Sequence, residues 1–238
     1  MKKAVYYILI VIFVGIFAFS AYKIGSYYWA KHKSEQVIQE AEKYVQVDKK
    51  SDEPELITVD FDALREINSD IVAWLYCPDT QINYPVVQGS DNMFYLSHLL
   101  DGSYNVNGTV FMDYRGAADF SDPNNILYGH HMKSGAMFAC LMQYKESDYY
   151  DAHPTMYLFT PDQTYRLDLL AGVVVKSDDD IYTADMTADK LAYYMNQSTF
   201  TTKTEPTETN KIVTLSTCSY EFDEARYVIL TQMVPIEK

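Results

Sequence analysis

The chain has 238 residues, 48% of them hydrophobic and 22% charged, which suffices for one full domain with a hydrophobic core but not for two comfortable domains. Residues 1–33 contain five lysines and no acidic residue. The remaining 205 residues therefore carry 14 basic and 33 acidic residues. This acidity argues against a nucleic-acid partner, because a phosphate backbone selects clustered lysine and arginine.

A membrane-spanning segment is predicted near the N-terminus. Residues 4–22 form an uncharged, apolar stretch with lysines on both sides, and about twenty apolar residues are what a bilayer-spanning helix needs. A cleaved signal peptide is the alternative, since residues 18–20 offer small residues in an A-x-A-like spacing, but the apolar stretch exceeds the usual hydrophobic core of such peptides. The flanking lysines alone leave the orientation open.

A stalk and a linker are expected after this segment. Ser34 is predicted to cap an amphipathic helix, and residues 47–55 (VDKKSDEPE) read as a charged linker. The apolar face of that helix comprises Val37, Ile38, Ala41, Tyr44 and Val45. The predicted division is a tail at residues 1–3, a span at 4–22, a stalk and linker at 23–55 and one folded domain at 56–238.

Strand-like segments rich in valine, isoleucine, tyrosine and threonine dominate the folded domain. Eight are predicted, at residues 71–76, 82–87, 109–113, 125–128, 155–160, 164–175, 211–217 and 226–234. Helices are expected at residues 60–67, 91–100 with Asp91 as cap, 136–144 and 184–197. Eight strands at this density indicate a mainly β fold and favour a closed barrel.

Cys218 and Arg226 are candidate functional residues because of their place between two predicted strands. Cys218 stands where an apolar strand ends, and a nearby cation favours the reactive thiolate. Arg226 opens the next strand, and adjacent strands lie about 4.8 Å apart, so the two side chains are expected to flank one site. The competing interpretations are a buried structural thiol and a surface arginine paired with Glu221, Asp223 or Glu224.

A cysteine nucleophile needs a histidine elsewhere as its partner. Of the five histidines, His130 and His131 stand out, because they follow a predicted strand and Gly129 and precede a predicted helix. Periodicity does not choose between the two. Cys77 and Cys140 have the surroundings of small core residues.

Two motifs then identify a resemblance. Asn-x-x-Tyr-Gly-His-x-Met-x-x-Gly-x-Met-Phe begins at residue 125, and Thr-Leu-Ser-Thr-Cys-x-Tyr-Glu-Phe-x-x-x-Arg begins at residue 214. Together with residues 84–89 and 107–113, they make residues 56–234 resemble class B sortases. By motif position, the resemblance assigns Cys218 as nucleophile, His130 as general acid and base, and Arg226 as oxyanion stabiliser, with His131 a neighbour of the catalytic histidine.

The resemblance implies an eight-stranded sortase-type β-barrel with N-terminal helices and a helix in the loop before the seventh strand. It also implies that five residues line a groove for a sorting signal: Asn92, Leu96, Tyr128, Tyr182 and Ser216. No cofactor is expected, and the acidic run at residues 178–180 is interpreted as a solvated turn in preference to a calcium site.

Sortase-like transpeptidation implies cleavage of a C-terminal sorting signal after threonine through a thioester, with transfer to an amine of a lipid-linked cell-wall precursor. The family's signals are Asn-Pro-x-Thr or Ser/Pro-Pro-x-Thr. The implied location is the outer face of a Gram-positive cell membrane, with the N-terminus inside. The alternatives are polymerisation of pilins through a lysine amine, a hydrolytic cysteine peptidase, and a catalytically silent peptide-binding module at the cell surface.

Overall fold

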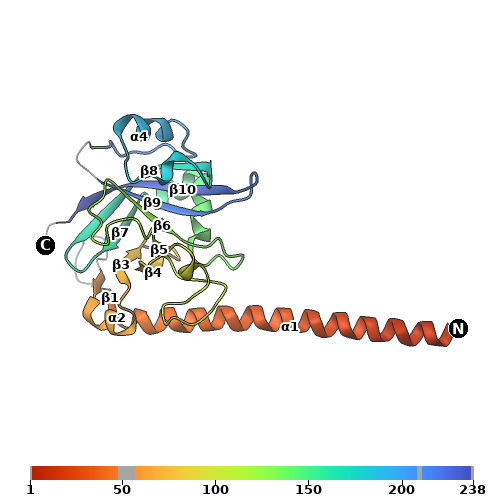
Figure 1. Ribbon diagram of the computed structural model, residues 1–238. Helices are drawn as coiled ribbons and strands as arrows, with labels where there is room; N and C mark the ends of the chain where they lie inside the picture. Colours follow the sequence, from red (N-terminus) through yellow and green to blue (C-terminus); the bar gives the residue numbers. More distant parts are fainter. Residues whose placement is uncertain (1, 48–56, 208–210, 237–238) are drawn as a thin grey trace.

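The computed structural model describes residues 2–47, 57–207 and 211–236. A single long helix projects from a body that is built mainly of β-strands (Figure 1). The barrel strands are β3 (Ile71–Tyr76), β4 (Asn83–Val87), β5 (Phe111–Met112), β6 (Asn124–Tyr128), β7 (Thr155–Phe159), β8 (Thr164–Lys176), β9 (Lys211–Cys218) and β10 (Ala225–Pro235).

These eight strands close into a barrel in the order β10-β8-β7-β3-β4-β5-β6-β9. The predicted mainly β fold and the predicted number of barrel strands are therefore confirmed. Neighbouring strands run antiparallel, except that β4 pairs with β5 and β6 pairs with β9 in parallel. The interior is filled by buried apolar side chains such as Leu75, Leu127, Leu158 and Ile229. Burial of such side chains supplies the main stabilisation of the barrel.

The helices cover the barrel and its loops. They are α1 (Lys2–Glu42), α2 (Phe61–Ile67), α3 (Ser147–Ala152) and α4 (Ala188–Met195), with 3-10 helices η1 (Phe94–Leu96), η2 (Phe138–Lys145) and η3 (Asp180–Tyr182). Helix α4 lies in the connection before β9, the seventh barrel strand, as the resemblance implied. A small sheet of β1 (Val45–Val47) and β2 (Ile57–Val59) and helix α3 were not predicted.

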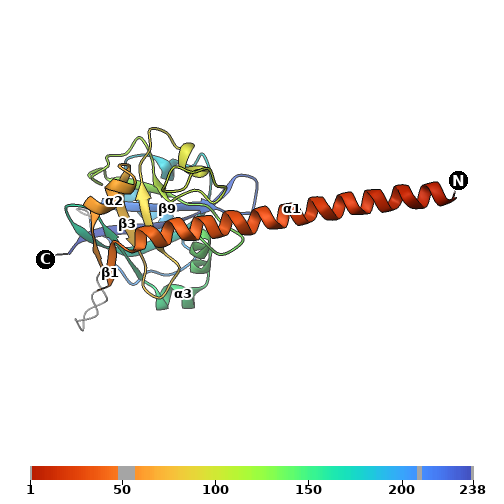
Figure 2. The same cartoon turned by 90° about the horizontal axis from the view of Figure 1, so that it is seen from below.

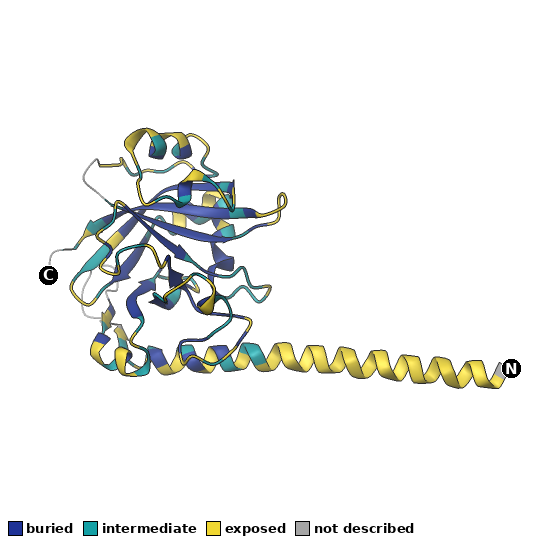
Figure 3. Cartoon of the chain, in the orientation of Figure 1, coloured by how far each residue is buried: buried dark blue, intermediate teal, exposed yellow. Residues whose placement is uncertain are grey.

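Helix α1 is continuous from Lys2 to Glu42, so the prediction of a separate helix capped by Ser34 is wrong. Ser34 lies within the helix and is buried against the body. By length and composition alone, α1 is long and apolar enough to cross a membrane. Where α1 meets the body, Val37 and Ala41 of the predicted apolar face are buried (Figure 3). Most of the predicted linker, residues 48–55, lies outside the described residues.

Two direct contacts tie α1 to the loop around residue 101. The Lys33 ammonium donates to the Asp101 carboxylate at 2.9 Å, and the Asn105 side-chain amide donates to the Ala30 carbonyl at 2.8 Å. In the two perpendicular views, the turn between β9 and β10 points along α1 towards its N-terminal end (Figures 1 and 2). The end of the barrel that carries this turn therefore lies on the side of the body from which α1 projects (Figures 1 and 2).

The predicted helix at residues 91–100 is wrong, because only the single turn η1 forms there. The Asp91 carboxylate accepts hydrogen bonds from the backbone of Met93 and Phe94. The carbonyls that a longer helix would use internally are engaged elsewhere: that of Tyr95 accepts from Thr109, and that of Leu96 accepts from His130. The predicted helix at residues 136–144 is observed as the 3-10 helix η2, shifted by two residues at its start.

Candidate active site

The β9–β10 hairpin sets Cys218 against Arg226. The two residues are direct partners in the antiparallel ladder, and directly opposed residues project from the same face of a sheet with their Cβ atoms about 4.5–5.5 Å apart. The Ser219 amide donates to the Ala225 carbonyl at 3.0 Å at the base of the turn. The nucleophile candidate and the cation candidate thus stand on rigid backbone at one end of the barrel.

The other two cysteines differ from Cys218 in their surroundings. Cys218 is half-buried, whereas Cys77 and Cys140 are fully buried. Burial raises the pKa of the Cys77 thiol and raises that of the Cys140 thiol to about 12, because a thiolate is poorly solvated in an apolar interior. Cys218 is therefore the thiol with the access that chemistry requires.

His130 reaches the same place from strand β6. Tyr128 pairs with Ser216 in the parallel ladder between β6 and β9, so two further residues bring His130 level with Cys218. The Gly129 amide donates to the Ser216 carbonyl at 3.1 Å, and the Thr217 hydroxyl donates to the Gly129 carbonyl at 2.8 Å. A Cβ at Gly129 would lie 2.6 Å from the ring of Phe138, so this close approach requires glycine.

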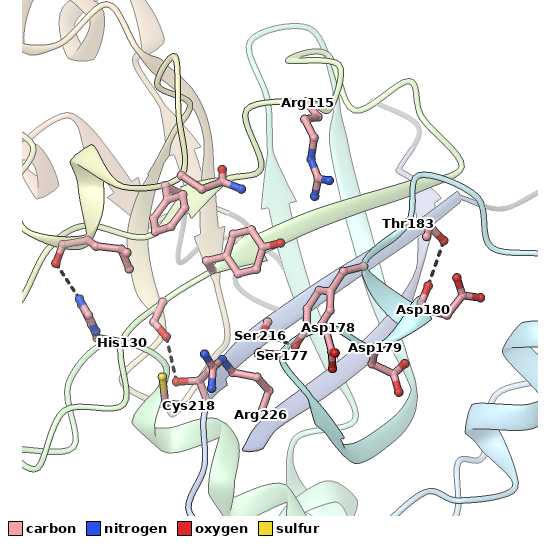
Figure 4. Close-up of a pocket in the computed structure, with 17 residues that line it drawn as sticks. Arg115, His130, Ser177, Asp178, Asp179, Asp180, Thr183, Ser216, Cys218 and Arg226 are labelled. Carbon is pink, nitrogen blue, oxygen red and sulfur yellow. Dashed lines mark hydrogen bonds between the residues drawn. The ribbon is translucent and has the colours of Figure 1, made fainter. Parts of the chain in front are cut away.

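The tautomer of His130 follows from its hydrogen bond. Its Nε2 lies 2.7 Å from the Leu96 carbonyl oxygen, which only accepts, so Nε2 carries a hydrogen. Nδ1 is then the nitrogen left for proton transfer. In Figure 4 the sulfur of Cys218 lies between the imidazole of His130 and the guanidinium of Arg226.

The Arg226 guanidinium is free of carboxylate partners among the described residues, which include the acidic turn at residues 221–224. Its Nη1 donates to the carbonyl of Ala225 at 2.9 Å. An arginine carries five N–H donors in a fixed planar arrangement, so further donors remain for an oxygen in the cleft. The alternative of a surface ion pair with Glu221, Asp223 or Glu224 is not observed.

All eight residues predicted for the site line one cleft of about 650 Å³. These are Asn92, Leu96, Tyr128, Tyr182 and Ser216 of the predicted groove, together with Cys218, His130 and Arg226. Nine further lining residues were not predicted for the site: Phe111, Arg115, Gly129, Ser177, Asp178, Asp179, Asp180, Thr183 and Thr217. Among the described residues, no group of three or more histidine, cysteine or acidic side chains is arranged to hold a metal ion.

A buried carboxylate organises one side of the cleft. Asp113, only 3% exposed, accepts hydrogen bonds from the Asn92 amide at 3.0 Å, the Tyr128 hydroxyl at 3.0 Å and the Arg115 guanidinium at 2.7 Å. Burial by itself raises the pKa of Asp113, but the hydrogen bonds, with those of Arg115 largest, prevail and lower it to about 2. Asp113 is thus an anion that fixes two residues predicted for the groove.

A second hydrogen bond in the cleft joins a tyrosine and a serine. The Tyr182 hydroxyl lies 2.9 Å from the Ser216 hydroxyl, and Ser216 is 2% exposed. Burial raises the pKa of Tyr182 to about 12, so this phenol is neutral at physiological pH. The 3-10 helix η3 thereby presents Tyr182 to strand β9.

The sequence and the fold are similar to those of known proteins. The family model described as Sortase domain matches residues 75–234. Sortase B of Listeria monocytogenes is 32% identical over 237 residues, covering 95% of each chain. A Bacillus anthracis crystal structure described as similar to sortase B superposes with a TM-score of 0.74 at 32% identity, covering 87% of this chain and 98% of that one.

A structure of a Staphylococcus aureus sortase B–substrate complex superposes with a TM-score of 0.69 at 28% identity, covering 74% of this chain and 85% of that one. The family match spans more than half of the sequence, and the Listeria relative spans nearly all of it. The chain belongs to the sortase family of cysteine transpeptidases, and within that family to class B.

Proposed function

We propose that this transpeptidase cleaves a C-terminal sorting signal after threonine and transfers the new carboxyl end to an amine of a lipid-linked cell-wall precursor. The observation that carries the proposal is the opposition of Cys218 and Arg226 across the β9–β10 ladder, with His130 in the lining of the same cleft. A nucleophile, a proton carrier and a cation are the three groups that acyl transfer through a thioester needs.

In the first half of the proposed reaction, the Cys218 thiolate attacks the threonine carbonyl carbon. The negative charge that develops on the carbonyl oxygen is stabilised by the free N–H groups of Arg226, worth about 3 kcal/mol for one donor. The tetrahedral intermediate collapses as protonated His130 donates its Nδ1 proton to the leaving amine nitrogen. The peptide C–N bond breaks and a thioester to Cys218 remains.

In the second half, the incoming amine attacks the thioester carbonyl and His130 takes up a proton from that amine. The C–S bond breaks, an amide forms and the thiolate of Cys218 is restored. Bond for bond, one amide is exchanged for another, so no external energy source is required. The hydrogen bond from Nε2 of His130 to Leu96 supports this role, because it holds the ring while Nδ1 transfers the proton.

The sorting signal is proposed to bind along the rest of the cleft. Asn92 and Tyr128 are fixed by Asp113, and Tyr182 is fixed by Ser216. Leu96 adds apolar surface beside His130. The Staphylococcus aureus sortase B–substrate complex, whose fold this chain shares, supports the binding of a peptide substrate in this cleft.

We also propose that α1 anchors the enzyme, with residues 4–22 in the membrane, the N-terminus inside and the folded domain outside. The length and composition of α1 support a membrane span. The β9–β10 turn next to Cys218 points along α1 towards its exposed part (Figure 1). An active site on that side of the barrel suits an acceptor amine carried by a membrane lipid.

The proposal is tested with the full chain in detergent, sorting-signal peptides of the Asn-Pro-x-Thr and Ser/Pro-Pro-x-Thr types, and either a wall-precursor amine or a pilin lysine. Mass spectrometry should find an amide product with the wall-precursor amine, lost in Cys218→Ala, His130→Ala and Arg226→Ala. Product formed only with the pilin lysine would instead establish a pilin polymerase. Free acid alone would indicate a hydrolase, and no turnover of any peptide would contradict the proposal.

A further inference from the structure

We propose that His131, the neighbour of the catalytic histidine, is a positioning residue that fixes the backbone of the nucleophile; this rests on the proposed role of Cys218. Nδ1 of His131 lies 2.8 Å from the Cys218 carbonyl oxygen. A carbonyl oxygen has no hydrogen to give, so the imidazole must donate. The side chain next to His130 therefore binds directly to the residue that carries the reactive sulfur.

The contact lies where the backbone ladder between β6 and β9 has ended. That ladder runs as far as Tyr128 and Ser216, and the Gly129 amide donates to the Ser216 carbonyl. His131 follows Gly129 by two residues, and Cys218 follows Ser216 by two. The His131 side chain donates to the Cys218 carbonyl. One imidazole thus continues the row of hydrogen bonds to the last residue of β9, beyond the last paired residues of the two strands.

His131 is itself held in place. Its backbone forms an isolated bridge with Met137, and its ring packs on Tyr220 with a centroid distance of 5.3 Å. His131 is half-buried and, unlike His130, is not part of the lining of the cleft. It therefore acts on the reaction through Cys218 and not by touching the substrate.

The two adjacent histidines consequently have different roles. His130 presents Nδ1 to the reacting groups, while His131 ties the loop that carries both residues to the backbone of Cys218. The hydrogen bond limits relative movement of the sulfur and the His130 ring. Displacing a reacting group by about 1 Å costs on the order of 100-fold in rate, so this restraint should appear in kcat and not in substrate affinity.

The test compares His131→Asn with His131→Leu in the full chain in detergent, with a sorting-signal peptide that the wild type turns over. Asparagine and leucine have similar shapes, but only asparagine can donate to the Cys218 carbonyl. His131→Leu should lower kcat by about 10- to 100-fold with KM within about threefold, and His131→Asn should restore kcat to within about threefold of wild type. His131→Phe keeps a ring against Tyr220 without a donor and should behave like His131→Leu.

The matched control is His153→Phe. His153 packs on Tyr149 with a centroid distance of 4.6 Å and is not among the residues that line the cleft. This variant should leave kcat unchanged. Unchanged kcat in both His131→Leu and His131→Phe would overturn the inference, as would an equal loss in all three His131 variants.

Hydrogen exchange of residues 216–220 gives a readout without turnover. Exchange should accelerate in His131→Leu and not in His131→Asn, and equal exchange in the two variants would overturn the inference. Activity that survives Cys218→Ala would refute the proposed function instead.

Discussion

The Leu96 carbonyl oxygen accepts a hydrogen bond from Nε2 of His130 at 2.7 Å, which joins a residue proposed to bind the sorting signal to the proposed proton carrier. This carbonyl is available because η1 ends after a single turn. The loop that contributes Leu96 and Asn92 to the cleft therefore also sets the orientation of the His130 ring.

Asp91→Ala should loosen that loop, because the Asp91 carboxylate holds the backbone amides of Met93 and Phe94 at 2.7 and 2.8 Å. We expect a small loss of thermal stability and a fall in kcat of several-fold, measured by thermal unfolding and by steady-state transpeptidation. Asp119→Ala removes a similar turn contact, to the amide of Ser121, at a residue that does not line the cleft, and should leave kcat unchanged. Equal kcat values for the two variants would contradict the link from η1 to His130.

Arg226→Ala should lower kcat/KM by about 100- to 1,000-fold, the usual cost of one oxyanion donor. Arg226→Lys should recover only part of this loss, because lysine keeps the charge but lacks the planar set of donors. Stability should change little, since the guanidinium has no carboxylate partner among the described residues. The control is Arg166→Lys, which alters the pair with Asp168 on strand β8 and should not affect the rate. Full activity in Arg226→Lys would show that charge alone suffices.

Tyr182→Phe should raise KM for the peptide several-fold and lower stability by about 1 kcal/mol. The change leaves the Ser216 hydroxyl, which is buried, without its 2.9 Å partner. The double variant Tyr182→Phe with Ser216→Ala should recover part of the lost stability, because neither hydroxyl is then left alone. Additive losses of stability would mean that the two hydroxyls do not interact.

Asp113→Asn should raise KM through Asn92 and Tyr128, whose amide and hydroxyl both donate to the Asp113 carboxylate. The neutral amide accepts more weakly than a carboxylate, so the two groove side chains lose their fixed positions. Peptide binding, measured by calorimetry in Cys218→Ala enzyme to prevent turnover, should weaken several-fold. Asp168→Asn, which alters a comparable pair with Arg166 outside the cleft, should leave binding unchanged.

The same carboxylate predicts a pH dependence of stability. Because the pKa of Asp113 is lowered to about 2 in the folded protein from a value of 3.8, its ionised form stabilises the fold above about pH 4 by roughly 2 kcal/mol. That contribution is lost as the pH falls through about 2. The difference in melting temperature between wild type and Asp113→Asn should therefore shrink between pH 4 and pH 2, and a constant difference would contradict the assignment.

The barrel could be predicted because most strands are runs rich in apolar and β-branched residues between turn residues, and β-branched residues favour strands. Cys218 and Arg226 could be paired in advance for the same reason, since a short polar turn between two strands brings their ends together. The choice of His130 over His131 required the motif resemblance, because both residues follow the same strand. In the structure the two imidazoles differ by what they contact, the Leu96 carbonyl for one and the Cys218 carbonyl for the other.

What the sequence did not reveal depends on contacts between distant segments. The segment at residues 91–100 has a helical pattern, but the carbonyls of Tyr95 and Leu96 accept hydrogen bonds from Thr109 and His130 instead of from the next turn. Asp113 joins partners from three segments, and no local pattern marks such a residue. Serine is a common helix N-cap, but no residue before Ser34 breaks the helix, so α1 continues through Ser34.

The most direct test of the proposed mechanism is the intact mass of the full chain after incubation with a sorting-signal peptide and no amine. A thioester mechanism predicts a covalent adduct equal to the peptide fragment that ends in threonine, located on Cys218 by proteolysis and released by an added amine as an amide. The adduct should be absent in Cys218→Ala and should form at least 100-fold more slowly in Arg226→Ala. An adduct on Cys77 or Cys140, or amide product from Cys218→Ala, would contradict the proposed mechanism.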